Sequence, residues 1–311
     1  MEEKEEKVTE KSDDDGRLWR SLLEAQTRLP NLATERRERY RTADPFPHAV
    51  FDGIFPDALL RAVAEENPEV CKQESGDGGV GPCYAFPRTN GCVAGSTSCF
   101  SKEKRGKGRN REYRKSTKDK DAQIPPVSRM LLAGLKSSSF TTFLERLSGV
   151  PALIPDPHYT GAGLHFTSTG GLLAVHADFN KLEMYGLDRR VNVFVFLNDD
   201  WTDSDGKSHG GHLELWDKNM TTCVTRIAPL FGRVVVFSTT DFSYHGHPAK
   251  LAAPPDRVRR SIAMYYYTNG RPSDECLDGD CSAATHNTIW KQLPKQCARC
   301  EDRECRGRGV R

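Results

Sequence analysis

From about residue 160 the chain alternates short apolar runs with turns, and this pattern predicts β-strands. The runs are rich in β-branched and aromatic residues, and Gly, Asn, Asp and Pro separate them. Because no helix-length pattern lies between them, a parallel sheet with crossover helices is not expected. About seven or eight such strands form a jelly roll of two packed sheets. The runs are GLLAVHAD, RRVNVFVFLN, GHLELWD, TRIAP, GRVVVFST, FSYHGHP and RRSIAMYYYT.

Helical patterns dominate the residues that precede these strands, and we expect the helices to cover one sheet. Ser138 or Ser139 can cap the last helix, and Gly149 can end it. The fold class is therefore mainly β with flanking helices (α+β). The segments are residues 17–42, which predict short helices, residues 46–68, which predict a strand and a helix, and residues 124–149, which predict two helices.

Composition adds two segments that match neither pattern. Residues 1–16 are charged and lack aromatic side chains, which predicts a disordered acidic tail. Residues 71–123 lack periodicity and predict a flexible insertion. Its part 101–121 holds ten Lys or Arg against four acids, which suits a solvated loop or a nucleic-acid contact.

The whole chain of 311 residues has a net charge of only +2, so its balance of charge indicates neither a nucleic-acid nor a membrane partner. The N-terminus has no apolar signal region, and no run of about 18 apolar residues occurs. We therefore expect an intracellular protein, cytoplasmic or nuclear, without a membrane anchor. Nothing in the sequence indicates its oligomeric state.

The strongest chemical signal is His176 and Asp178, two residues apart on a predicted strand. Alternate side chains of a strand point to one face, so both can reach one metal ion. Two imidazoles and one carboxylate are the set that binds non-haem iron(II) and leaves positions open. The third ligand must come from another strand, where His245 and His247 are both candidates.

A second signal is Arg260 in the last predicted strand. It shares a face with apolar residues, and a buried guanidinium needs an anionic partner. A carboxylate of an acidic co-substrate can be held by such a fork. The alternative is that Arg259 or Arg260 is exposed or paired with a surface acid.

Residues from about 150 to 272 resemble the prolyl-4-hydroxylase-like branch of the iron(II)/2-oxoglutarate dioxygenases. The resemblance implies a double-stranded β-helix with Fe(II), 2-oxoglutarate and ascorbate. It implies His176, Asp178 and His245 as metal ligands, Arg260 on the co-substrate, and Asn192 in the co-substrate pocket. The matching motifs, in order, are DPHYTGAGLH, GGLLAVHADFN, DRRVNVFVFLNDDW, GGHLELWD, APLFGRVVVFSTTDFSYHGHP and RRSIAMYYYTNGRP.

The chain departs from this family at two tyrosine positions. Phe166 and Phe196 stand where animal prolyl hydroxylases often place tyrosines on the co-substrate. We expect other donors, such as His165 or Thr167, to replace the missing hydroxyls. This departure weakens the case for proline as the substrate.

The expected function is hydroxylation of an unactivated C–H bond, on a protein side chain such as proline, with release of succinate and CO2. A non-catalytic binding module is the alternative, with the basic insertion and the Cys-rich tail contacting nucleic acid or a protein. A cupin-like zinc hydrolase is a third reading, but it gives Arg260 no task. Retention of all four residues, His176, Asp178, His245 and Arg260, favours the enzyme.

The C-terminal tail, residues 273–311, is rich in cysteine. Cys297 and Cys300 have the spacing of a zinc knuckle, and Cys276 with Cys281 can complete a four-cysteine structural zinc site. Free thiols or adventitious disulfides are the alternative. The expected domains are the acidic tail 1–16, a helical support region 17–150 that contains the insertion, the dioxygenase domain 151–272, and the tail.

Overall fold

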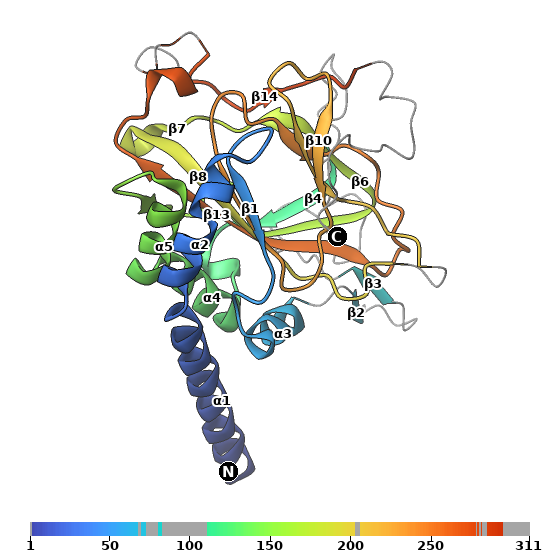
Figure 1. The fold of residues 1–311 in the computed structure, drawn as a ribbon. Helices are drawn as coiled ribbons and strands as arrows, with labels where there is room; N and C mark the ends of the chain where they lie inside the picture. Colours follow the sequence, from blue (N-terminus) through green and yellow to red (C-terminus); the bar gives the residue numbers. More distant parts are fainter. Residues whose placement is uncertain are drawn as a thin grey trace.

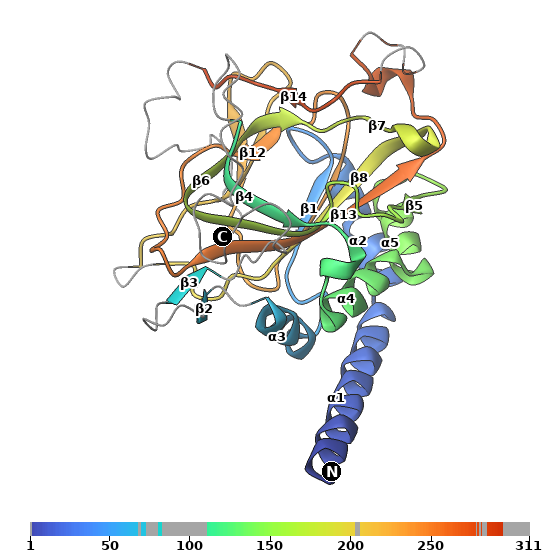
Figure 2. The ribbon, with the colours of Figure 1, turned by 180° about the vertical axis from the view of Figure 1, so that it is seen from behind.

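The structure is a computed structural model that describes residues 2–67, 70–72, 80–82, 111–202, 206–277, 279, 281 and 285–294. Figures 1 and 2 show a curled antiparallel sheet with helices gathered on one side and α1 running away from the body. The helices are α1 (Glu2–Gln26), α2 (Leu29–Arg41), α3 (Asp57–Glu66), α4 (Pro126–Lys136) and α5 (Ser138–Ser148), with short 3-10 turns at Asp121–Gln123, Glu183–Tyr185 and Ser273–Glu275.

The main sheet confirms the predicted jelly-roll class. Its strand order is β1-β11-β8-β13-β6-β12-β9-β10, and every registered pair is antiparallel. In the described residues, β2 and β3 form a separate two-stranded sheet. The strands are β1 (His48–Phe51), β2 (Val70–Lys72), β3 (Val80–Pro82), β4 (Glu112–Lys118), β5 (Ile154–Pro155), β6 (Gly163–Ala177), β7 (Lys181–Leu182), β8 (Leu187–Phe196), β9 (Leu213–Trp216), β10 (Cys223–Ile227), β11 (Val234–Ser238), β12 (His245–His247), β13 (Val258–Thr268) and β14 (Ile289–Trp290).

Strand β6 connects the two halves of the roll. Its first part, from Gly163 to Ser168, pairs with β13, whereas Leu173 and His176 pair with β12. The glycines 170 and 171 lie between these parts, where a bend is least costly. One strand therefore places its two ends against different walls of the same barrel.

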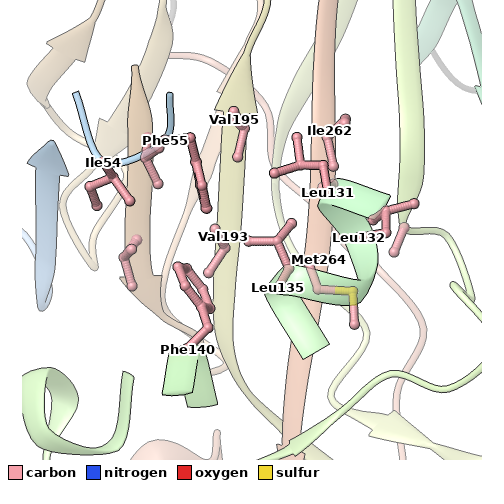
Figure 3. Close-up of a cluster of buried hydrophobic side chains, with 14 of the residues drawn as sticks. Ile54, Phe55, Leu131, Leu132, Leu135, Phe140, Val193, Val195, Ile262 and Met264 are labelled. Carbon is pink, nitrogen blue, oxygen red and sulfur yellow. The ribbon is translucent and has the colours of Figure 1, made fainter. Parts of the chain in front are cut away.

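The helices pack on one face of β8 and β13. Leu131, Leu135 and Phe140 from α4 and α5 meet Val193 and Met264 from the strands, and all five are fully buried (Figure 3). The N-cap of helix α5 is Ser137, whose hydroxyl accepts from the Phe140 amide, so the cap lies one residue before the first predicted candidate, Ser138. Gly149 is the C-cap and follows the last helical residue, as predicted. This core positions β8 and β13, whose opposite face lines the cavity described below.

Two segments differ from their composition-based expectations. The structure has the first part of α1 where we expected disorder over residues 1–16, and Glu and Lys at helical spacing favour that helix. Within the insertion, residues 112–118 form β4, which pairs with β6 from Leu164 to Leu173. Residues 101–110 of the basic stretch lie outside the described residues.

Candidate metal centre

Three side chains expected from the sequence lie together in the wall of one cavity. His176 on β6 is directly opposite His245 on β12, and Asp178 follows β6. Their ligand atoms all lie within 4.8 Å of one another. His176 Nε2 is 3.4 Å from Asp178 Oδ1, and His245 Nε2 is 3.5 Å from Asp178 Oδ2. Among the described residues this is the one group of His, Cys, Asp or Glu suited to a metal.

The hydrogen bonds of both imidazoles suit metal binding. His176 Nδ1 lies 2.8 Å from the Ala174 carbonyl, and His245 Nδ1 lies 2.9 Å from the Ser243 carbonyl. With the proton on Nδ1, each ring turns an unprotonated Nε2 toward the cluster. Burial lowers the pKa of His245 to about 4, although Asp178 acts in the opposite sense, so this ring is neutral at pH 7. The donor set therefore fits Fe(II).

Asp178 is held as a carboxylate by two buried neighbours. Its Oδ2 accepts from Asn192 Nδ2 at 2.7 Å and lies 3.0 Å from Arg189 Nη2. Burial would raise the pKa of Asp178, but Arg189 and the imidazoles outweigh it and hold this pKa well below its usual range. With Oδ2 occupied, Oδ1 is the oxygen left for a metal. Asn192 thus sits behind Asp178, and the structure does not bring it into the cavity wall where we expected it.

Arg189 reaches this carboxylate because of an irregularity in β8. Tyr266 is opposite Val191 but Tyr267 is opposite Arg189, so Arg190 is an extra residue in the ladder. The Arg189 guanidinium lies 3.4 Å from the Tyr265 ring centroid, and its Nε donates to Asn192 at 2.9 Å. A regular two-residue alternation does not predict this placement, and we did not expect it from the sequence.

A cavity of about 330 Å³ opens beside the three ligands. Arg259 lines it, and burial lowers the pKa of this guanidinium to about 9, which leaves it charged at neutral pH. Its Nε donates to the Gly211 carbonyl at 2.8 Å. Over the described part of the chain, no carboxylate pairs with it. A buried cation of this kind is suited to an anionic ligand.

Arg260, by contrast, points away from the cavity. Its Nη1 donates to the carbonyls of Ala64 (3.1 Å) and Asn67 (2.9 Å), and its Nη2 donates to Leu197 (2.9 Å). Successive strand residues face opposite sides, and Arg260 lies on the helix side with Ile262. The structure therefore corrects the expected placement: the arginine beside the candidate metal site is Arg259, one residue earlier.

The two phenylalanines at the expected tyrosine positions lie on different sides of the sheet. Phe166 belongs to the helix-side core, whereas Phe196 is buried 5.0 Å from the Arg259 guanidinium carbon. Of the two expected substitute donors, His165 lines the cavity, and Thr167 is buried without being part of the lining. His247, the other candidate ligand, also lines the cavity but is not part of the metal-type cluster.

The C-terminal segment covers the metal cluster, which its sequence did not indicate. Strand β14 pairs with the end of β6, and the Trp290 ring centroid lies 4.9 Å from that of His176. Asp241 anchors the segment through Arg271 and through His286 Nε2, the latter at 2.8 Å. Trp290 is therefore part of the cavity wall.

The cysteines of this segment give no zinc site in the described residues. Cys276 and Cys281 are joined in a disulfide, and a disulfide offers no thiolate to zinc. Cys297 and Cys300 lie outside the residues that the structure describes. The first cysteine pair of the expected zinc site, Cys276 and Cys281, thus forms the disulfide that was the alternative.

Among the residues that the structure describes, no helix has the length and apolarity that a membrane span requires.

Comparison with solved structures gives several 2OG-Fe(II) oxygenases at low identity. A prolyl hydroxylase from Trichoplax adhaerens, solved with a hypoxia inducible factor peptide fragment, has a TM-score of 0.45, 15% identity, and coverage of 78% of this chain and 91% of that chain. A prolyl-4-hydroxylase from Pseudomonas putida has a TM-score of 0.44 and 15% identity, and the match covers 76% of this chain and 100% of that chain. HygX from Streptomyces hygroscopicus, with nickel and 2-oxoglutarate bound, has a TM-score of 0.43 and 11% identity, and the match covers 84% of this chain and 96% of that chain. We draw no substrate from these likenesses.

The comparison with curated proteins gave no match. The comparison with family models gave one, the 2OG-Fe(II) oxygenase superfamily, over residues 162–267. This span runs from the start of β6 to the end of β13 and includes all three candidate ligands and Arg259. Residues 162–267, about a third of the chain, therefore match the model of the 2OG-Fe(II) oxygenase superfamily.

Proposed function

We propose that the protein is an Fe(II)- and 2-oxoglutarate-dependent dioxygenase that hydroxylates an unactivated C–H bond of a protein side chain, with proline the first candidate. One observation carries the proposal. The three ligands His176, Asp178 and His245 lie in the same cavity as a buried guanidinium, Arg259, which pairs with no carboxylate among the residues that the structure describes. A metal site and a carboxylate site in one cavity suit a co-substrate that is both a chelator and an acid.

The protein's own residues have distinct tasks in this scheme. His176, His245 and Asp178 Oδ1 would hold Fe(II), while Arg189 and Asn192 keep the second carboxylate oxygen occupied. When bound, Fe(II) and 2-oxoglutarate supply the chemistry, in which oxidative decarboxylation to succinate and CO2 is coupled to insertion of one oxygen atom of O2 into a C–H bond. A set of three protein ligands would leave part of the coordination sphere free for the co-substrate and O2.

Arg259 would bind the second carboxylate of the co-substrate. Its stem is packed between Gly211 and Phe196, and a Cβ at Gly211 would come within 2.7 Å of the Arg259 side chain. The close approach of a glycine therefore leaves room for this guanidinium. Phe196 supplies an aromatic surface but no hydroxyl, so polar contacts to the ligand must come from other residues.

The rim of the cavity suits a side chain that carries an unactivated C–H bond. Phe179, Tyr265 and Trp290 present aromatic surface next to the metal cluster. Such a rim excludes water from the reacting carbon. A protein or peptide is the proposed substrate, and ascorbate remains the expected reductant for oxidised iron.

The test is a screen of peptides and protein extracts for a mass gain of one oxygen atom coupled to succinate release. We expect succinate formation to require Fe(II), 2-oxoglutarate and the folded chain, and to disappear in Asp178→Ala. Anaerobic Fe(II) with 2-oxoglutarate should also give a weak visible charge-transfer band. If neither the band nor succinate is observed, the binding-module reading replaces this proposal.

A further inference from the structure

Strand β4, which comes from the basic insertion, contributes a cation to the catalytic cavity. Lys115 lines that cavity, and its side chain is only 15% exposed. The family domain begins at residue 162, so this strand lies outside it. The basic segment therefore has a task that neither the metal centre nor Arg259 accounts for.

The register places Lys115 and Arg259 on either side of β6. Lys115 is opposite Thr167, and Thr167 is opposite Arg259. Residues paired across neighbouring antiparallel strands point to the same face. The next row, Thr117, His165 and Ser261, obeys the same rule and also lines the cavity. Two cationic side chains thus enter one recess from opposite directions.

The groups between these two cations are neutral and polar. Burial, together with both Lys115 and Arg259, lowers the pKa of His165 well below the usual value. His247 is 3% exposed, and among the described residues its buried Nδ1 has no hydrogen-bond partner. A positive recess with an unsatisfied polar atom is suited to an anion that can also hydrogen-bond.

A carboxylate already contacts Lys115 in the structure. Lys115 Nζ lies 3.1 Å from Glu112 Oε1, and the Glu112 side chain is 45% exposed at the cavity rim. An ion pair with one partner so exposed is weak, because water screens it. A ligand carboxylate inside the recess can therefore replace Glu112 at little cost.

We propose that Lys115 is a second cationic contact for the dicarboxylate co-substrate, sharing with Arg259 the carboxylate far from the metal, and that Glu112 competes for Lys115 until the ligand enters. The proposal rests on the proposed function, because it requires 2-oxoglutarate in this cavity. It explains how the recess binds a dianion although Phe196, the one of the two phenylalanines on this side of the sheet, supplies no phenol hydroxyl. It also gives the insertion strand a specificity-determining role.

The chain offers a matched control on the same strand. Lys118 is opposite Leu164 and faces the helix side, where its Nζ donates to Asn67 Oδ1 at 3.3 Å and lies 5.4 Å from the Phe166 ring centroid. Lys115→Met and Lys118→Met therefore remove the same charge from opposite faces of β4. Affinity for 2-oxoglutarate is measured by anaerobic calorimetry on the Fe(II)-loaded full chain, and affinity for Fe(II) is measured separately.

We expect Lys115→Met to weaken 2-oxoglutarate binding about tenfold or more and Lys115→Arg to restore most of it. Lys118→Met should change it less than about twofold, and Fe(II) affinity should be unchanged in all three variants. Glu112→Gln removes the competitor and should tighten 2-oxoglutarate binding about two- to fivefold. In the Lys115→Met background, Glu112→Gln should have no effect.

Equal 2-oxoglutarate affinity in wild type and Lys115→Met would overturn this inference alone. A rise in the KM of the hydroxylated substrate, with 2-oxoglutarate binding unchanged, would overturn it too and place Lys115 on that substrate. Failure of the wild-type protein to bind 2-oxoglutarate would overturn the proposed function as well, so the two failures are distinguishable.

Discussion

Strands β8 and β13 both carry buried arginines inside and outside the cavity, and the arginines in these two places have different roles. Each strand carries a tandem arginine pair, Arg189 with Arg190 and Arg259 with Arg260, and in each pair one guanidinium reaches the cavity while the other does not. On β13 the split follows from simple alternation. On β8 it follows from the extra residue at Arg190 in the ladder.

The arginines outside the cavity are bound by fixed acceptors. Arg260 donates to three backbone carbonyls, and Arg190 donates to Thr268 Oγ1 at 3.1 Å and Glu275 Oε1 at 3.0 Å. Of the cavity arginines, Arg259 has no described acidic partner, and Arg189 shares its partner Asp178 with the metal site. A buried arginine thus has a structural role where the protein itself supplies the hydrogen-bond acceptors. It has a binding role where a ligand must supply them.

The largest effect should come from the helix-side core. Phe140 is fully buried against Phe55, Phe143 and Tyr266. Phe140→Ala should lower the free energy of unfolding by about 3–5 kcal/mol, because it leaves a cavity in this core. Urea unfolding measures the loss, and 2-oxoglutarate affinity of the remaining folded protein should be unchanged. Loss of that affinity at normal stability would contradict the separation of the two faces.

Arg259→Met and Arg260→Met should have opposite consequences. Arg259→Met should weaken 2-oxoglutarate binding about 100-fold without lowering stability, because it removes a charge-assisted contact and an uncompensated buried cation. Arg260→Met should lower the free energy of unfolding by about 3 kcal/mol, because buried carbonyls lose their donors. Calorimetry and urea unfolding separate the two results, and a reversed pattern would restore Arg260 as the co-substrate residue.

Arg189→Met and Arg190→Met compare a cavity arginine with an arginine outside the cavity by their effect on Fe(II) binding. Arg189→Met should weaken Fe(II) binding about tenfold, because Asp178 Oδ2 loses a partner that orients the carboxylate. Arg190→Met should leave Fe(II) affinity unchanged and lower stability instead. The affinities are measured by competition with a chelator under anaerobic conditions. Equal or tighter metal binding in Arg189→Met would show that the guanidinium only repels the ion.

The smallest effect should come from the segment that covers the cavity. The pKa of His286 is raised: burial lowers it, but hydrogen bonding to Asp241 outweighs burial. The resulting stabilisation is complete below the unfolded pKa of about 6.5 and is lost as pH rises through the higher folded value. His286→Gln should remove this pH-dependent part, about 1 kcal/mol or less. Thermal unfolding between pH 6 and pH 9 measures it, and an unchanged pH slope would argue against the contact.

The sequence identified much of the fold and of the metal cluster. The predicted runs correspond to strands from β6 to β13, and His176, Asp178 and His245 lie within reach of one ion. These features depend on local alternation and on the order of motifs, which are both legible in a chain. The expected position of Arg260 was wrong. Alternation along a strand shows that Arg259 and Arg260 face opposite sides of the sheet, but it does not show which side holds the cavity.

Local sequence determined the β-rich character of residues 160–268, the helices before them and the residue types of a non-haem iron site. Only the tertiary structure decided that β4 and Lys115 join the cavity, that Arg259 rather than Arg260 faces it, and that Trp290 covers His176. The physical reason is that a strand's periodicity is set by its own backbone. Which strands become neighbours, and where a ladder gains an extra residue, depends on packing between segments far apart in the chain.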